Sequence, residues 1–149
     1  MRLRLAVGLV ITVVAAFSAV AAQAGPAPLV ITTAHTSLGT ILTNGARTVY
    51  LSLADSSGHS RCTGSCAAVW PPVKATGPLK AAGGVKASLL GEIALHGGGK
   101  QVTYDHHPLY YFASDKQHST SGEAVNGFYA VDVAGGKVVP AKAAPKSGW

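Results

Sequence analysis

YLSLAD at residues 50–55 and YYFASD at residues 110–115 are two versions of one pattern, set sixty positions apart in the chain. Each version begins with a tyrosine, runs through mainly apolar residues and ends on an aspartate. The match extends outward, because the same shift places Thr43 on Thr103. An internal duplication predicts two similar units that share one core, since neither unit can bury its apolar face alone.

The residues around both copies predict β-hairpins. In the first copy, residues 40–43 and 47–53 are rich in β-forming residues and flank Asn44-Gly45, a strong short-range hairpin signal. In the second copy, residues 101–104 and 109–112 stand on either side of a short polar break. The sequence therefore predicts two related hairpin units.

The rest of the chain is poor in helix signals. Residues 128–139 predict a third hairpin, whose turn contains two glycines. Only residues 65–70 and 87–95 have the pattern of a short helical turn, and residues 74–85 are typical of a loop. The predicted fold class is all-β, mostly antiparallel and with little helix, after an N-terminal signal helix.

The N-terminal residues predict export. Arg2 and Arg4 precede an apolar run that ends in Ala-Gln-Ala, the small-x-small pattern of a signal peptidase site. We expect cleavage after Ala24 and not a retained membrane anchor, and no cysteine follows the apolar run to carry a lipid. The expected product is secreted or periplasmic, without a stable membrane anchor. The predicted organisation is a signal peptide at 1–24, a linker at 25–35, one β domain at 36–140 with repeats at about 39–72 and 99–139, and a disordered tail at 141–149.

The charge of the chain indicates solubility and not nucleic-acid binding. The full sequence has a formal net charge of +6 at pH 7, and two of its basic residues belong to the predicted signal peptide. The remaining lysines occur singly and are not interleaved with aromatic residues, so no phosphate-binding stripe is predicted. We expect no nucleic-acid partner, but an envelope partner or a small ligand.

The chain has two cysteines, Cys62 and Cys66. In an oxidising compartment we expect them to form a disulfide, and Gly64 makes the required bend easier. The alternative is a soft-metal site, because thiolates and imidazole suit copper(I), and the set to test is His59, Cys62, Cys66 and His118. That alternative describes a copper- or haem-handling electron-transfer protein, although a covalent haem is disfavoured because alanine, not histidine, follows the second cysteine.

The duplicated tyrosines and aspartates admit a structural and a catalytic interpretation. Tyr50 and Tyr110 would bury their rings while each hydroxyl finds a partner, and Asp55 and Asp115 would accept turn amides at the strand ends. Alternatively, the two carboxylates would face each other as an acid/base pair. The sequence contains no Gly-x-Ser-x-Gly elbow, phosphate-binding glycine loop or His-Glu-x-x-His motif. We therefore favour the structural interpretation and predict no catalytic residues.

These motifs together resemble the bacterial secreted-repeat lipoproteins, a family known by a duplicated Tyr-x-aromatic-x-x-Asp motif and without a settled biochemical function. The resemblance covers residues 38–139. It is carried by GTIL at 39–42, Tyr50 and Asp55, CTGSC at 62–66, WPP at 70–72, QVTY at 101–104, and Tyr110, Phe112 and Asp115. Ser52 occupies the aromatic position of the first repeat, and the lipidated cysteine of many relatives is missing. The resemblance and the missing catalytic motifs predict a secreted, non-catalytic module that binds or scaffolds in the cell envelope.

Overall fold

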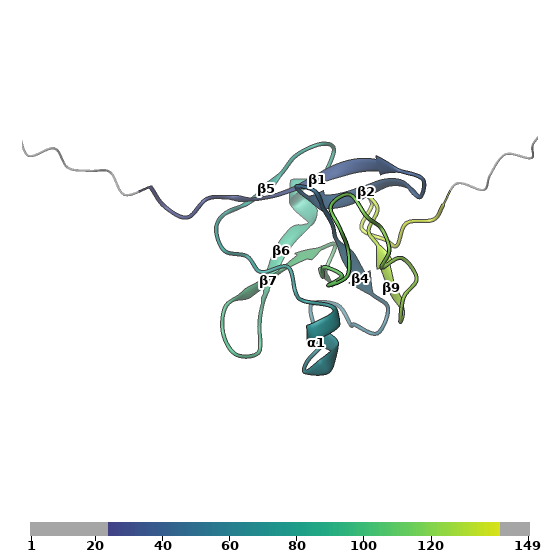
Figure 1. Ribbon diagram of the computed structural model, residues 1–149. Coiled ribbons are helices and arrows are strands. Elements are labelled where there is room, and N and C mark those ends of the chain that lie inside the picture. The colour runs from purple at the N-terminus through teal and green to yellow at the C-terminus, as the bar shows by residue number, and fades with distance from the viewer. Residues whose placement is uncertain (1–23, 141–149) are drawn as a thin grey trace, which may run out of the picture.

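A computed structural model describes residues 24–140 of the chain, and Figure 1 shows how its elements are arranged. The predicted signal peptide, apart from Ala24, and the predicted tail at 141–149 lie outside the described residues. The described part consists mainly of β-strands in three small sheets, with one short α-helix. The predicted fold class, all-β with little helix, is confirmed.

The three sheets are built almost entirely from antiparallel neighbours. Their strand orders are β3-β2-β1-β5, β4-β9 and β6-β7-β8, and of these pairs only β1 with β5 is parallel. The elements in chain order are β1 (Leu29–Thr36), β2 (Gly39–Asn44), β3 (Arg47–Thr48), β4 (Tyr50–Ser52), α1 (Ser65–Val69), β5 (Leu79–Ala81), the 3-10 turn η1 (Ala87–Leu89), β6 (Leu90–Ala94), β7 (Lys100–Tyr104), β8 (His107–Pro108) and β9 (Phe128–Ala130).

The first predicted hairpin is present, but its second strand is interrupted. β2 pairs with β3 across a two-residue turn, in which Gly45 has a φ of 57°, a left-handed conformation that glycine adopts without steric cost. The chain leaves β2 at Val49, which is fully buried, and β4 pairs with β9 instead. The single strand predicted at 47–53 is therefore divided between two sheets.

The second and third hairpins also follow the predicted turns. β7 pairs with β8 across Asp105 and His106, whose φ values of 46° and 66° are both positive, as a type I′ turn requires. Pro108 lies in β8 at the edge of its sheet, where its missing N–H removes no ladder bond. After β9 the chain turns back, and Val131 pairs with Lys137.

Two segments predicted to be irregular contain strands. The structure differs from the predicted linker at 25–35, because β1 occupies most of it and pairs along β2. The predicted loop at 74–85 contains β5, which places Leu79 beside Leu29 in the parallel pair. The reason is burial: Ile31 on β1 has no exposed surface and completes a core that the hairpin of β2 and β3 leaves open.

The two repeats meet through reciprocal backbone pairs. Tyr50 and Tyr110 lie opposite each other, and the N–H of each donates to the carbonyl of the other at 2.9 Å. Pro72, from the end of the first repeat, also pairs with Tyr110, and Ala130, from the end of the second, pairs with Tyr50. The end of each repeat thus pairs with the motif tyrosine of the other repeat. This reciprocal pairing relates the two repeats by an approximate two-fold rotation.

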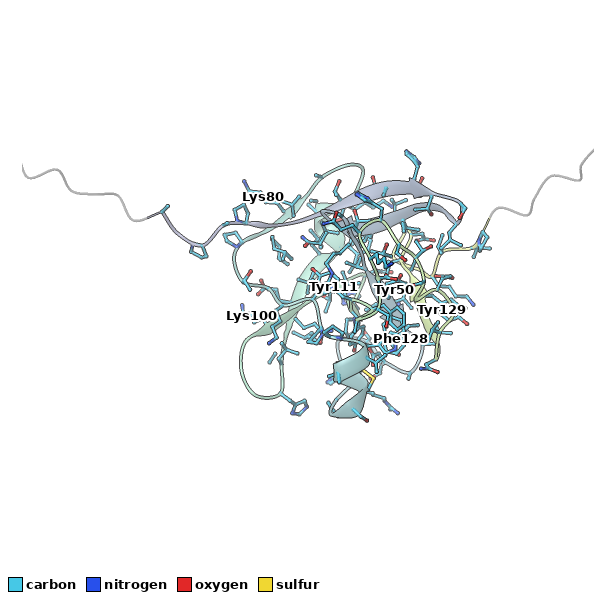
Figure 2. The ribbon with its side chains drawn as sticks, in the orientation of Figure 1. Tyr50, Lys80, Lys100, Tyr111, Phe128 and Tyr129 are labelled. Carbon is cyan, nitrogen blue, oxygen red and sulfur yellow. A yellow bond between two sulfur atoms is a disulfide. The ribbon has the colours of Figure 1, made fainter. Side chains whose placement is uncertain are left out.

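Aromatic rings fill the core where the repeats meet. Trp70 stacks on Phe128 with ring centroids 4.0 Å apart and an interplanar angle of 5°. Each of these rings receives the edge of a tyrosine, since Tyr50 contacts Trp70 at 5.3 Å and Tyr110 contacts Phe128 at 5.2 Å. Figure 2 shows Tyr50 and Phe128 together in the interior. This cluster joins the repeats, because the two stacked rings, Trp70 and Phe128, come from different repeats.

Candidate functional site

The duplicated tyrosines and aspartates pair across the repeats and not within them. The Tyr50 hydroxyl donates to Asp115 Oδ2 at 2.5 Å, and the Tyr110 hydroxyl donates to Asp55 Oδ2 at 2.6 Å. Both tyrosines are fully buried. Hydrogen bonds to a charged acceptor are stronger than neutral ones, so these two contacts bind one repeat firmly to the other. We call them the Tyr–Asp cross-pairs.

The second oxygen of each carboxylate holds the loop that follows it. Asp55 Oδ1 accepts a bond from the Arg61 backbone N–H at 2.7 Å. Asp115 Oδ1 accepts bonds from the Ser121 backbone N–H at 3.0 Å and from its hydroxyl at 2.6 Å. Arg61 and Ser121 are again sixty positions apart. Each aspartate therefore closes its own loop while it receives a tyrosine from the other repeat.

The buried tyrosines are held in their protonated form. Burial raises the pKa of Tyr50 and the pKa of Tyr110 far above the ordinary value, and the hydrogen bond to a neighbouring carboxylate raises each further. A phenol with such a pKa remains a donor and does not act as a base near neutral pH. The two aspartates accept from different tyrosines, Asp55 from Tyr110 and Asp115 from Tyr50, and no hydrogen bond joins the two carboxylates within residues 24–140.

The third position of the repeat motif, where an aromatic residue is expected, differs between the copies. Phe112 packs against Trp70 with ring centroids 4.6 Å apart. Ser52, its counterpart, is buried and its hydroxyl accepts a bond from the Ala54 N–H at 3.2 Å. The first repeat therefore replaces an aromatic contact with a local turn contact, so the two copies are not equivalent around the shared core.

Cys62 and Cys66 form a disulfide, with Cα atoms 5.1 Å apart, at the start of α1. Gly64 between them has a φ of 57°, which permits the tight bend. In this oxidised form neither sulfur is a thiolate. Within residues 24–140, no group of three or more His, Cys, Asp and Glu side chains is placed to hold a metal, so His59 and His118 are not joined to the cysteines as a ligand set.

A cavity of about 560 Å³ lies beside the disulfide. Its walls come from the loop before α1, from Pro71 and Pro72, and from the end of β6 with the turn that follows it. His59 and Cys62 line it, but neither aspartate of the cross-pairs does. Sequence reasoning missed this cavity, because its walls are far apart in the chain and no recognised motif connects them.

The described residues contain no helix long and apolar enough to cross a membrane. Their fold and their cross-pairs define a class: a duplicated β domain whose two repeats complete each other. A family model described as a secreted repeat of unknown function matches residues 32–74 and 94–131, one segment in each repeat. These segments cover more than half of the chain, and the protein belongs to that family, as the resemblance predicted. No curated protein and no solved structure matches the chain.

Proposed function

We propose that this protein is a non-catalytic, extracytoplasmic binding module of the cell envelope. One observation carries the proposal: the groups best suited to acid/base chemistry, the two aspartates and their tyrosines, are hydrogen-bonded to each other across the repeats. The cavity lies apart from them and is lined by loop residues. A rigid core that carries a cavity on its loops is the usual arrangement of a binding protein.

The size of the cavity supports a small ligand. Ligand sites commonly enclose about 300 to 1,000 Å³ and combine apolar walls with a few polar groups. This cavity has about 560 Å³ and both kinds of lining. The disulfide at its rim restricts the loop that forms one wall, so little ordering of that loop is required on binding.

Native mass spectrometry tests the proposal. The oxidised protein is incubated with a filtered small-molecule extract of the cell envelope, beside an Ala94→Trp variant that fills the cavity and an Ala134→Trp control that changes an exposed residue outside it. We expect a molecule retained by the native protein and by the control, lost in Ala94→Trp and recovered with unchanged mass. Recovery of a converted product would contradict a non-catalytic role, and retention by Ala94→Trp would contradict this site.

We propose further that export uses the N-terminal segment, with cleavage after Ala24 and without lipidation. The charged residues, apolar run and small-x-small site of the sequence support this proposal. The intact mass of protein recovered from the medium or the periplasm checks it. A chain that begins at Gly25 is expected, and a chain that carries a lipid or retains the segment would contradict it.

A copper(I) titration distinguishes the proposed binding module from the copper-handling electron-transfer protein. The protein is reduced and titrated with copper(I) under anaerobic conditions, beside a variant with both Cys62→Ser and Cys66→Ser. A binding module of the kind proposed gives no stoichiometric copper binding that depends on the cysteines. Stoichiometric binding that the double variant loses would favour electron transfer.

A further inference from the structure

The cavity lies where the two repeats depart from their common pattern. Fifteen positions separate Asp55 from Trp70, but only thirteen separate Asp115 from Phe128, which occupies the equivalent place in the aromatic stack. The extra residues belong to the disulfide loop. The pairing of β1 with β2 also leaves a two-residue turn, whereas the pairing of β6 with β7 leaves five residues, 95–99.

These two departures face each other across the cavity. Residues of the disulfide loop line one side, and Leu95 to Gly98 of the longer turn line the other. Figure 1 shows α1 and the turn between β6 and β7 on the same side of the fold. The duplicated core does not require either extension, because each repeat packs without the extension that the other one carries. The cavity is therefore an addition to the scaffold and not a packing defect of it.

The lining contains basic side chains and no carboxylate. Lys74, His59 and His96 line the cavity, and no aspartate or glutamate does. Glu92, the acidic residue on the neighbouring strand β6, forms an ion pair with Lys100 at 2.6 Å outside the lining. Basic groups without a carboxylate partner favour an anion, because attraction to a ligand is not offset by an internal ion pair.

The polar groups at the rim are fixed in place by the fold. The Nδ1 of His59 donates to the Ser57 carbonyl at 2.9 Å, and this bond orients the ring. The Oγ of Ser60 lies 2.6 Å from the Tyr110 hydroxyl oxygen, and this hydrogen bond connects the cavity lining to one Tyr–Asp cross-pair. Groups held in position before binding lose little entropy when a ligand arrives.

Part of the lining is apolar. Pro71, Pro72, Ile93 and Leu95 contribute to the walls. Such walls remove the apolar part of a ligand from water, which favours binding. A bare inorganic anion would leave these walls unused, so the lining fits a molecule with both an anionic group and an apolar body.

We propose that the cavity binds a small anionic molecule that carries a carboxylate or phosphate on an apolar body. The basic residues receive the anionic group, and the prolines, Ile93 and Leu95 enclose the body. This inference rests on the binding role proposed above and names the ligand class for the same site.

Three probes of similar shape test the ligand class. Phenylacetate, phenyl phosphate and the neutral phenylacetamide are titrated into the full protein, and binding is followed by NMR shifts of the cavity glycines. The variants Lys74→Gln and His96→Gln remove basic side chains of the lining, and Lys80→Gln and His35→Gln are matched controls outside the lining. Lys80 is exposed on β5 at the outer edge of the fold (Figure 2).

We expect saturable binding of at least one anionic probe, and the two anions compared show whether the cavity prefers a carboxylate or a phosphate. Each lining variant should weaken that binding about two- to fivefold, the range of an exposed polar or charged contact, while the controls leave it unchanged. Equal or tighter binding of phenylacetamide would overturn the anionic class but keep the binding role. Absence of saturable shifts with both anions at millimolar concentration would overturn the inference, and turnover of a probe would overturn the binding role itself.

Discussion

At the scale of single residues, the central feature is a phenol that donates a hydrogen bond to a carboxylate of the other repeat. Tyr50 and Tyr110 are buried among aromatic rings, where an unpaired hydroxyl would be costly. Asp115 and Asp55 supply the acceptors and keep their second oxygens for loop amides. The sequence predicted that the hydroxyls would need partners, and it predicted the role of the aspartates in turns.

The raised tyrosine pKa values predict a loss of stability in alkali. In the unfolded chain these phenols ionise near pH 10, whereas in the folded protein they remain protonated to higher pH. Their contribution is therefore fully present below about pH 10 and is lost as the pH rises further. The free energy of unfolding should fall by about 1.4 kcal/mol per pH unit for each tyrosine, measured by urea unfolding between pH 8 and 12. A variant with Tyr50→Phe and Tyr110→Phe should lose this part of the slope, and an identical slope in the variant would contradict the expectation.

At Gly122 the neighbouring side chains leave no room for a Cβ atom. A Cβ at this position would lie 2.8 Å from the Trp70 ring and 2.9 Å from Phe112 Cβ, so Gly122→Ala should displace the aromatic stack. We expect a loss of about 1 to 3 kcal/mol in the free energy of unfolding, the usual effect of overpacking. Gly136→Ala is the matched control, because the nearest atom to its Cβ is 3.7 Å away. Equal melting temperatures for the two variants would show that the ring stack tolerates the methyl group.

At the scale of elements, the hairpins were predictable because the residues that form each turn are adjacent in the sequence. Asn44-Gly45 and the polar break at 105–108 marked the two turns between flanking β-forming runs. The strand β5 was not predictable, because it has three residues and its partner on β1 lies fifty positions away. The strand β1 was missed although it pairs with its neighbour β2 across a two-residue turn. A short strand is stabilised by burial against a distant partner, which no local pattern reports.

The disulfide is an element-scale staple on the loop that leads into α1. It closes a short loop between Cys62 and Cys66 and therefore restricts the unfolded chain only slightly. Replacing both cysteines with serine should lower the free energy of unfolding by about 1 to 2 kcal/mol, measured by chemical denaturation. Addition of a reductant to the native protein should produce the same loss. A double-serine variant as stable as the oxidised protein would show that the bond does not stabilise the fold.

At the scale of the whole molecule, each repeat is completed by the other. The reciprocal backbone pairs, the shared aromatic stack and the Tyr–Asp cross-pairs all connect the two copies. The sequence predicted a duplication with a common core. The sequence could not predict that the tyrosine of one copy pairs with the aspartate of the other. Matching patterns identify equivalent residues, but they do not say whether a contact lies within one copy or between the two. For the same reason it missed the cavity, which depends on where the two copies differ.

A pair of double-mutant cycles tests this exchange most directly. One cycle combines Tyr50→Phe with Asp115→Ala, and the other combines Tyr50→Phe with Asp55→Ala, so both use the same kinds of substitution. The free energies of unfolding should show a coupling of about 1 to 3 kcal/mol between Tyr50 and Asp115, and almost none between Tyr50 and Asp55. A coupling confined to Tyr50 and Asp55 would mean that each repeat pairs with itself, and would contradict the exchanged structure.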